Sequence, residues 1–118
     1  MTTILLIDDD EFENVVMTRL IANHVKYGFR VDFARSIDEA IKYLKKQTYD
    51  HVYLDDVLSY DVNATVSVEQ IKAHLNGAPL VIISNNIERD YLKSNDILNV
   101  DAIVSKNDLS DYIYATAA

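Results

Sequence analysis

The chain has 118 residues, of which 49% are hydrophobic, and its net charge is −8. This length suits one domain with a buried core, and we expect a single domain over residues 1–118. The acidic balance argues against binding to nucleic acid or to an anionic membrane surface. No apolar run approaches the roughly 20 residues that a membrane-spanning helix needs. Cysteine is absent, which excludes disulfides and thiolate metal sites. Because the N-terminus also lacks a signal-peptide pattern, we expect the cytoplasm.

Short apolar runs alternate with helical patterns through the first half of the chain. Residues Thr3–Ile7 are mostly apolar, as is typical of a strand buried on both faces. A helix is predicted next, and Gly28 is expected to cap its end. The apolar side chains of this helix are Phe12, Val15, Val16, Leu20 and Ile21. Residues 29–34 alternate like a strand, and Ser36 with Glu39 forms a capping box for a second helix.

The second half continues the same alternation. Ser67 and Gln70 offer another capping box, and Gly77 lies at the expected end of that helix. The remaining predicted elements are strands over 51–54, 80–84 and 101–105, a short helix from about Ile87 to Ser94, and a last helix from Leu109 to about Ala115. Alternating strands and helices predict a parallel sheet covered on both faces. We therefore expect an α/β, flavodoxin-like, doubly wound sheet of five strands in the order 2-1-3-4-5.

Polar side chains gather where the predicted strands end. In chain order they are Asp8, Asp9, Asp10, Asp55, Asp56, Ser84 and Lys106. Ligands of such sheets bind beyond the carboxyl ends of the strands. Clustered carboxylates repel one another unless a cation lies among them, and an all-oxygen set suits Mg²⁺. A carboxylate can also attack phosphorus, with a lysine and a hydroxyl binding the phosphoryl oxygens.

Four segments resemble the receiver domain of two-component response regulators, and together they span essentially the whole chain. They are ILLIDDDE, YDHVYLDD, PLVIISN and VDAIVSKN. The resemblance implies that Mg²⁺ is held by Asp8, Asp9, Asp55 and the backbone carbonyl of Val57. It also implies that Asp55 accepts a phosphoryl group from a histidine kinase or a histidine phosphotransfer protein. The phosphoryl oxygens would then be bound by Ser84 and Lys106.

The resemblance further implies a signalling switch that is not an enzyme in the ordinary sense. Phosphorylation would change the surface around the fourth helix, the fifth strand and the fifth helix, and a downstream target protein would bind there. Receivers also often form homodimers through the face between the fourth and fifth helices. The sequence leaves open whether the chain is a phosphorelay intermediate, a diffusible regulator, a phosphate sink or a piece of a longer protein.

Several positions depart from the family pattern. Asn107 stands where a proline commonly follows the lysine, and Ile103 replaces the aromatic residue of the switch. Gating by rotation of a ring is therefore unavailable, and we expect a different readout. Asn85 is larger than the usual residue after the hydroxyl, which could slow access to Asp55. Asn99 stands where glycine is frequent, and asparagine tolerates the left-handed conformation.

Two other functions remain open. A degenerate receiver could act as an unphosphorylated protein-binding module. A Mg²⁺-dependent phosphohydrolase of the haloacid-dehalogenase type is the other alternative. Its motif needs two aspartates separated by one residue and then Thr or Val. Asp8 and Asp10 have that spacing, but Phe12 occupies the final position.

Other polar and aromatic residues receive plainer interpretations. We interpret the histidines as structural or surface residues; they are His24, His51 and His74. Tyr112 and Tyr114 could belong to a partner surface, although core packing explains at least one of them equally well. Asp56 has no assigned role beyond adding negative potential.

Overall fold

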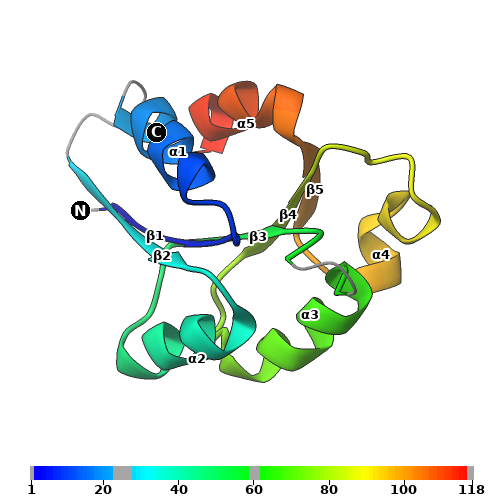
Figure 1. Cartoon of the computed structure of the whole chain (residues 1–118), viewed down its shortest axis with the longest axis horizontal. Helices are drawn as coiled ribbons and strands as arrows, with labels where there is room; N and C mark the ends of the chain where they lie inside the picture. The colour runs from blue at the N-terminus through cyan, green and yellow to red at the C-terminus, as the bar shows by residue number, and fades with distance from the viewer. Residues whose placement is uncertain (1, 23–27, 59–61, 117–118) are drawn as a thin grey trace.

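One parallel sheet of five strands forms the centre of the computed structural model, which describes residues 2–22, 28–58 and 62–116 (Figure 1). The strands are β1 (Thr2–Ile7), β2 (Phe29–Ala34), β3 (His51–Asp55), β4 (Leu80–Ser84) and β5 (Ala102–Ser105). Their order across the sheet is β2-β1-β3-β4-β5, and neighbouring strands run parallel. This order confirms the predicted doubly wound, flavodoxin-like topology.

Helices cover both faces of the sheet. The α-helices are α1 (Glu11–Ala22), α2 (Ile37–Lys46), α3 (Ala64–Ile71), α4 (Asn95–Leu98) and α5 (Leu109–Thr116). Three short 3₁₀ helices are η1 (Lys72–His74), η2 (Asp90–Leu92) and η3 (Lys106–Asp108). Helices α1 and α5 lie together on one face, and α2 and α3 lie on the other with α4 beside α3 (Figure 1). None of the helices in these ranges has the length and apolar character needed to cross a membrane.

Side chains of the central strands alternate between two buried clusters. In β1, Leu5 and Ile7 pack under α2 and α3, whereas Ile4 and Leu6 pack under α1 and α5. All four are at most 1% exposed, because successive residues of a strand point to opposite faces and both faces are covered. The apolar run over residues 4–7 of β1 follows directly from this double burial.

Local signals at helix ends gave both correct and wrong predictions. Ser36 is confirmed as the N-cap of α2, since the Glu39 N–H donates to Ser36 Oγ at 3.2 Å. The Glu39 side chain accepts the Arg35 N–H at 2.8 Å rather than that of Ser36, so the capping box is only half formed. The capping box at Ser67 and Gln70 is wrong, because α3 begins one turn earlier with Asn63 as its N-cap. The Asn63 side chain accepts the Thr65 N–H at 2.9 Å.

The helix predicted from Ile87 to Ser94 is also wrong. This stretch contains only the 3₁₀ turn η2, and Ser94 begins the next helix rather than ending one. Its Oγ accepts the Asp96 N–H at 3.2 Å, which caps α4. Helix α4 ends at Asn99 with φ 55°, so the expected left-handed conformation is confirmed.

Helix α1 buries a narrower face than predicted. Met17 and Ile21 are buried, but Phe12 is 69% exposed and Val15 is 45% exposed, so these two do not belong to the core face. Gly28 has a φ of 90°, in the range that favours glycine. Residues 23–27, which join α1 to Gly28, lie outside the described residues, so capping by this glycine stays a prediction.

Neither of the two histidines that the structure describes joins the carboxylates at the strand ends. His51 lies half-buried in β3 next to the ring of Tyr53, and burial lowers its pKa. His74 lies half-buried in η1. His24 lies outside the described residues. The positions of the first two agree with a structural role.

Candidate functional site

Three carboxylates converge at the carboxyl edge of the sheet. Asp8 and Asp9 follow β1, and Asp55 ends β3, which is the neighbouring strand. One oxygen from each carboxylate lies within 4.8 Å of the other two. Asp8 is 1% exposed and Asp55 is 8% exposed, while Asp9 is open to solvent. The sequence-based prediction that these residues meet is therefore confirmed by the geometry.

Burial raises the pKa values of the two buried carboxyl groups, Asp8 and Asp55. It raises the pKa of Asp55 to about 7, and the charge of Asp8 adds to this effect. It likewise raises the pKa of Asp8 to about 6, against the opposing effect of the Asp10 N–H, which donates to Asp8 Oδ1 at 3.0 Å. A cation placed among these oxygens would favour their charged forms.

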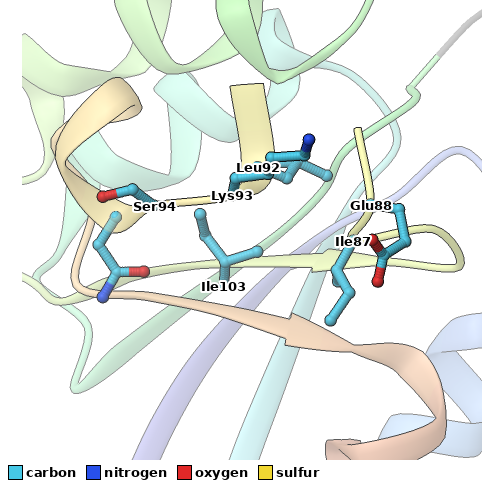
Figure 2. A pocket seen from close by; sticks show the side chains of 7 residues that line it. Ile87, Glu88, Leu92, Lys93, Ser94 and Ile103 are labelled. Carbon is cyan, nitrogen blue, oxygen red and sulfur yellow. The ribbon is translucent and has the colours of Figure 1, made fainter. Parts of the chain in front are cut away.

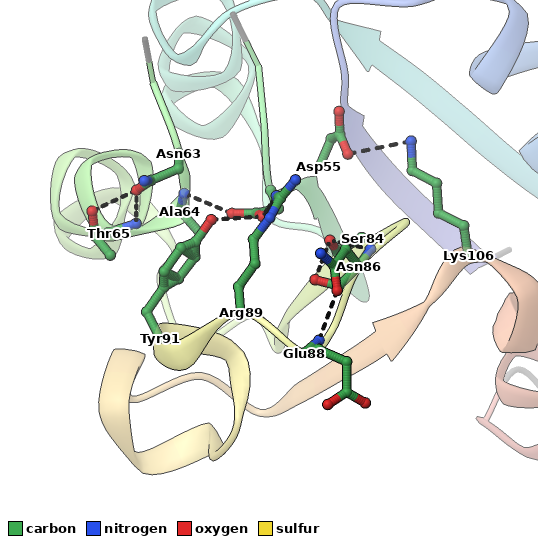
Figure 3. A network of polar contacts seen from close by, with 11 residues as sticks. Asp55, Asn63, Ala64, Thr65, Ser84, Asn86, Glu88, Arg89, Tyr91 and Lys106 are labelled. Atoms are coloured by element: carbon green, nitrogen blue, oxygen red, sulfur yellow. Dashed lines mark hydrogen bonds and ion pairs between the residues drawn. The ribbon is translucent and has the colours of Figure 1, made fainter. Parts of the chain in front are cut away.

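Lys106, the first residue of η3, supplies one positive charge to the cluster. Its Nζ lies 3.3 Å from Asp55 Oδ1 (Figure 3). It lies 3.7 Å from Asp8 Oδ2. It also lies 3.3 Å from Oε1 of Glu13 in α1. Burial works against the charge of Lys106, but the surrounding carboxylates outweigh it and raise its pKa. One lysine thus serves three acidic groups, so negative charge predominates.

Glu13 is a site residue that the sequence analysis missed. Asp10 caps α1 by accepting the Phe12 N–H at 2.9 Å, and Glu13 lies in the first turn that follows. A carboxylate in the first turn of a helix is ordinarily explained by the helix dipole. Its place in the sequence could have indicated the role of Glu13, because the first turn of α1 directly follows the acidic residues 8–10.

The carboxylate cluster has the donor atoms and the unmet bonding capacity for a hard metal ion. Oδ2 of Asp8 is buried and has no hydrogen-bond partner among the described residues. Mg²⁺ prefers carboxylate oxygens and retains several waters, so three such groups around one exposed edge suit it. Val57 follows two residues after Asp55 and is exposed. Its carbonyl stays a predicted ligand.

Ser84 lies at the same edge, but its hydroxyl is engaged within its own loop. It is 2% exposed at the end of β4, and Asp55 pairs with the preceding residue, Ile83. Ser84 Oγ accepts the Asn86 N–H at 3.1 Å and contacts the Asn86 carbonyl at 3.3 Å. The hydroxyl would have to leave Asn86 to reach a group on Asp55.

The sequence also matches the model of a known protein family over almost its full length. The match is to the response regulator receiver domain and covers residues 4–116. The chain belongs to the response regulator receiver family. No curated protein matches this receiver significantly.

Solved structures resemble this receiver in fold at low sequence identity. A two-component response regulator from Clostridium difficile has a TM-score of 0.80 at 23% identity, covering 98% of this chain and 91% of that one. The receiver domain of the sensor histidine kinase PA1611 from Pseudomonas aeruginosa has a TM-score of 0.78 at 18% identity, with 98% and 93% covered. That structure has a magnesium ion coordinated in its active site cleft.

A third structure carries a modified aspartate. It is a response regulator protein from Burkholderia pseudomallei with a phosphorylated aspartic acid, a calcium ion and citrate. Its TM-score is 0.78 at 18% identity, and the match covers all of this chain and 67% of that one. At such identities these likenesses support the fold of this receiver and no finer statement.

Asp56 has a structural role that the sequence analysis did not foresee. It is 1% exposed, and its Oδ1 accepts the Ala64 N–H at 3.0 Å, at the start of α3. Its Oδ2 accepts the Tyr91 hydroxyl at 2.8 Å and pairs with the guanidinium of Arg89 (Figure 3). Asp56 therefore does more than add negative potential, the single role that the sequence suggested. Its basic partner could not be found from the sequence because it lies 33 positions further along the chain.

The departures at Asn107 and Ile103 have visible local consequences. The Asn107 N–H donates to Ser105 Oγ at 3.3 Å, a bond that a proline could not make. Ile103 lines a hollow of about 510 Å³ with Ile87, Leu92, Lys93 and neighbours (Figure 2). The same two isoleucines line a second hollow of about 420 Å³ that reaches Asp111 and Tyr112 on α5. Both hollows lie on the face where the family resemblance places partner binding.

The two tyrosines of α5 have different surroundings. Tyr112 is half-buried and packs edge-on against the ring of Tyr53, with centroids 6.4 Å apart. Tyr114 is 70% exposed. Core packing therefore explains Tyr112, while Tyr114 stays a candidate for a partner surface.

Proposed function

We propose that this receiver is a phosphoacceptor switch in which Asp55 takes a phosphoryl group in a Mg²⁺-dependent manner. The donor would be a phosphohistidine on a histidine kinase or a histidine phosphotransfer protein. One observation carries the proposal: a nearly buried carboxylate, Asp55, lies 3.3 Å from the Lys106 ammonium and within 4.8 Å of the oxygens of Asp8 and Asp9. Phosphoryl transfer needs mainly positioning and charge neutralisation, and three carboxylates that can hold Mg²⁺ beside one lysine can supply both.

The proposed reaction is a single displacement at phosphorus. An Asp55 carboxylate oxygen forms the new bond to phosphorus, the bond between phosphorus and the histidine nitrogen breaks, and the departing imidazole takes up a proton. Lys106 is already beside Asp55 and would pair with the phosphoryl oxygens. The Ser84 hydroxyl would turn from Asn86 toward them. A Mg²⁺ ion held by Asp8, Asp9, Asp55 and the Val57 carbonyl would neutralise charge on the carboxylates and the phosphoryl group.

Similar proteins support this assignment by analogy. The PA1611 receiver domain holds magnesium in its active site cleft, and the Burkholderia pseudomallei protein carries a phosphorylated aspartic acid. The carboxylate cluster of this receiver lies at the carboxyl edge of the same fold, which is where doubly wound sheets bind ligands. The residue roles rest on this chain's own geometry together with the family resemblance.

The product would act as a signal rather than as a released compound. We expect a downstream target protein, or a second copy of this receiver, to bind the face formed by α4, β5 and α5. The two hollows that share Ile87 and Ile103 lie on that face. The proposal assumes the cytoplasm, where a histidine kinase domain would meet the receiver, and it involves no contact with nucleic acid or a membrane.

Intact-mass spectrometry after incubation with acetyl phosphate and Mg²⁺ tests the proposal. Here the oxygen–phosphorus bond of the donor breaks and acetate leaves. We expect the parent protein to gain one phosphoryl group, and Asp55→Asn or omission of Mg²⁺ to abolish the gain. Asp10→Asn is a matched control, because it removes a nearby charge while asparagine still caps α1.

Two results would contradict the proposal. One is the absence of any mass gain in the parent under all conditions, which would favour the unphosphorylated binding module. The other is an equal gain in Asp55→Asn, which would place the acceptor elsewhere. Repeated hydrolysis of small phosphate esters would instead favour the phosphohydrolase alternative.

A further inference from the structure

Asp56 is a buried carboxylate whose charged partner comes from a distant loop. Its two oxygens receive hydrogen bonds from the Ala64 N–H, the Tyr91 hydroxyl and the Arg89 guanidinium. Among the described residues Arg89 is the cation that compensates this 1% exposed side chain. A buried charge that loses its partner is strongly unfavourable, so the pairing has a structural consequence that an exposed ion pair lacks.

Arg89 belongs to the segment of residues 85–94, which follows Ser84 directly and leads into α4. Most of this segment is exposed, and its other described hydrogen bonds stay local, such as the one from the Glu88 N–H to the Asn86 side chain at 3.0 Å. The described side-chain hydrogen bonds that tie it to a part of the chain distant in sequence are those of Arg89 and Tyr91 to Asp56. Buried Leu92 adds apolar packing. Asp56 therefore holds this segment in place through the side chains of Arg89 and Tyr91.

The anchor lies directly beside the proposed phosphoacceptor. Asp56 follows Asp55 directly in the chain. Figure 3 shows Arg89 reaching from its segment toward the end of β3, where Asp55 lies. A phosphoryl group on Asp55 would add negative charge and oxygen acceptors at this end. Guanidinium groups bind phosphoryl oxygens in a bidentate manner and are not lost to deprotonation.

We propose that Arg89 couples phosphorylation of Asp55 to the segment 85–94, because the phosphoryl group competes with Asp56 for its guanidinium. This inference rests on the proposed function. In the resting chain Asp56 and Tyr91 hold Arg89. In the phosphorylated chain the guanidinium is drawn toward the new anion, Asp56 keeps the hydrogen bonds from the Ala64 N–H and the Tyr91 hydroxyl, and the segment changes its position or its mobility.

The coupling would reach the partner face without an aromatic switch. Ile87 lies two residues before Arg89 and lines both hollows of that face, together with Ile103. Figure 2 shows the first of these hollows. A shift of the segment therefore changes the shape of both hollows at once. Ile103 has no aromatic ring whose rotation could report phosphorylation. Movement of Arg89 and its segment would transmit the change to the partner face instead.

Amide hydrogen exchange, resolved to the segment 85–94, tests the inference in resting and phosphorylated protein. The variants are Arg89→Gln, Arg89→Lys and the matched control Asp90→Asn. Asp90 lies in the same segment, but its side chain is fully exposed and, among the described residues, pairs only with Lys93, which is 60% exposed. Phosphoryl content is measured by intact mass in every sample, so only samples of equal content are compared.

In the resting state we expect exchange of the segment to be at least about ten-fold faster in Arg89→Gln than in the parent, because a buried ion pair is lost. Arg89→Lys restores part of the protection, and Asp90→Asn matches the parent. On phosphorylation, exchange of the segment changes in the parent and in Asp90→Asn. It changes no further in Arg89→Gln, a difference that a merely structural arginine would not produce.

The double variant Asp56→Asn/Arg89→Gln covers the case in which Arg89→Gln alone fails to fold. It removes both charges together, and the asparagine oxygen can still accept the Ala64 N–H. We expect it to fold and to lack the response to phosphorylation.

The outcomes separate this inference from the proposed function. A phosphorylated parent whose segment does not respond overturns the coupling and leaves the phosphoacceptor assignment standing. A full response in Arg89→Gln or in the double variant also overturns the coupling. A parent that takes up no phosphoryl group overturns both, while the resting comparison still decides whether Asp56 anchors Arg89.

Discussion

At the scale of single residues, folding buries Asp55 and Asp8 and so disfavours the ionised form of both carboxyl groups. Their folded pKa values, about 7 and about 6, lie above the ordinary value of 3.8. Between about pH 4 and pH 7 the folded chain therefore binds more protons at these two groups than the unfolded chain does. The free energy that this proton uptake contributes to stability is lost as the pH rises through that window.

This difference in proton binding predicts that, without metal, the unfolding free energy of the parent depends more strongly on pH than that of Asp55→Asn. From about pH 4.5 to pH 7.5 the parent should lose roughly 1–3 kcal/mol more unfolding free energy than the variant, since the variant has no charge to form at position 55. Urea denaturation with a chelator present measures both proteins. Parallel pH profiles would show that Asp55 ionises in the folded chain as easily as in the unfolded chain.

The residues that could be predicted from the sequence are those fixed by backbone topology. Asp8, Asp55 and Lys106 lie directly at strand ends, so the order of the strands alone brings them to one edge. Glu13 and Arg89 could not be predicted in the same way. Each reaches its partner through a long side chain, and that reach depends on the orientation of a helix turn or a loop.

At the scale of elements, the strands were easier to predict than the helix boundaries. The strands bury continuous apolar runs on two covered faces, which leaves a strong signal in the sequence. Helix starts depend on one side chain meeting one backbone N–H, and serine or asparagine can do this at several neighbouring positions. Ser67 and Asn63 both had the right chemistry for α3, and only packing of the helix decides between them.

The start of α3 yields a prediction about these two residues. Asn63→Ala should lower the unfolding free energy by about 1 kcal/mol, because the N-cap hydrogen bond to the Thr65 N–H is lost. Ser67→Ala should change it little or raise it, since Ser67 Oγ is buried without a hydrogen-bond partner in the described parts of the chain. Thermal and urea unfolding compare the two variants. The reverse ranking would restore Ser67 as the cap.

At the scale of the whole molecule, one acidic edge and a net charge of −8 act together on any bound cation. The doubly wound topology was predictable because alternating elements and right-handed crossovers leave few arrangements. That topology brings Asp8, Asp9 and Asp55 together, and it makes metal binding a property of the folded chain alone. Ligands that bind only the folded state stabilise it by mass action.

Mg²⁺ should therefore raise the unfolding free energy of the parent by roughly 1–3 kcal/mol when its concentration is 10- to 100-fold above its Kd. Asp9→Asn should reduce this gain, and its exposed position means that the metal-free variant should still fold. Denaturation at matched ionic strength with NaCl separates site binding from general screening of the acidic surface. An equal gain from NaCl alone would contradict a specific metal site.

The site residues come from two halves of the chain that are synthesised one after the other. The carboxylates belong to the first half, and Ser84 and Lys106 belong to the second. Strands β1, β2 and β3 are neighbours in the sheet and end at Asp55, so every carboxylate of the cluster has been translated before Ser84 and Lys106. At typical elongation rates the lysine follows Asp55 by roughly 3–10 s. A nascent chain that pairs its first three strands in that interval would hold the acidic cluster without its lysine, and a divalent cation would be the compensating charge then at hand.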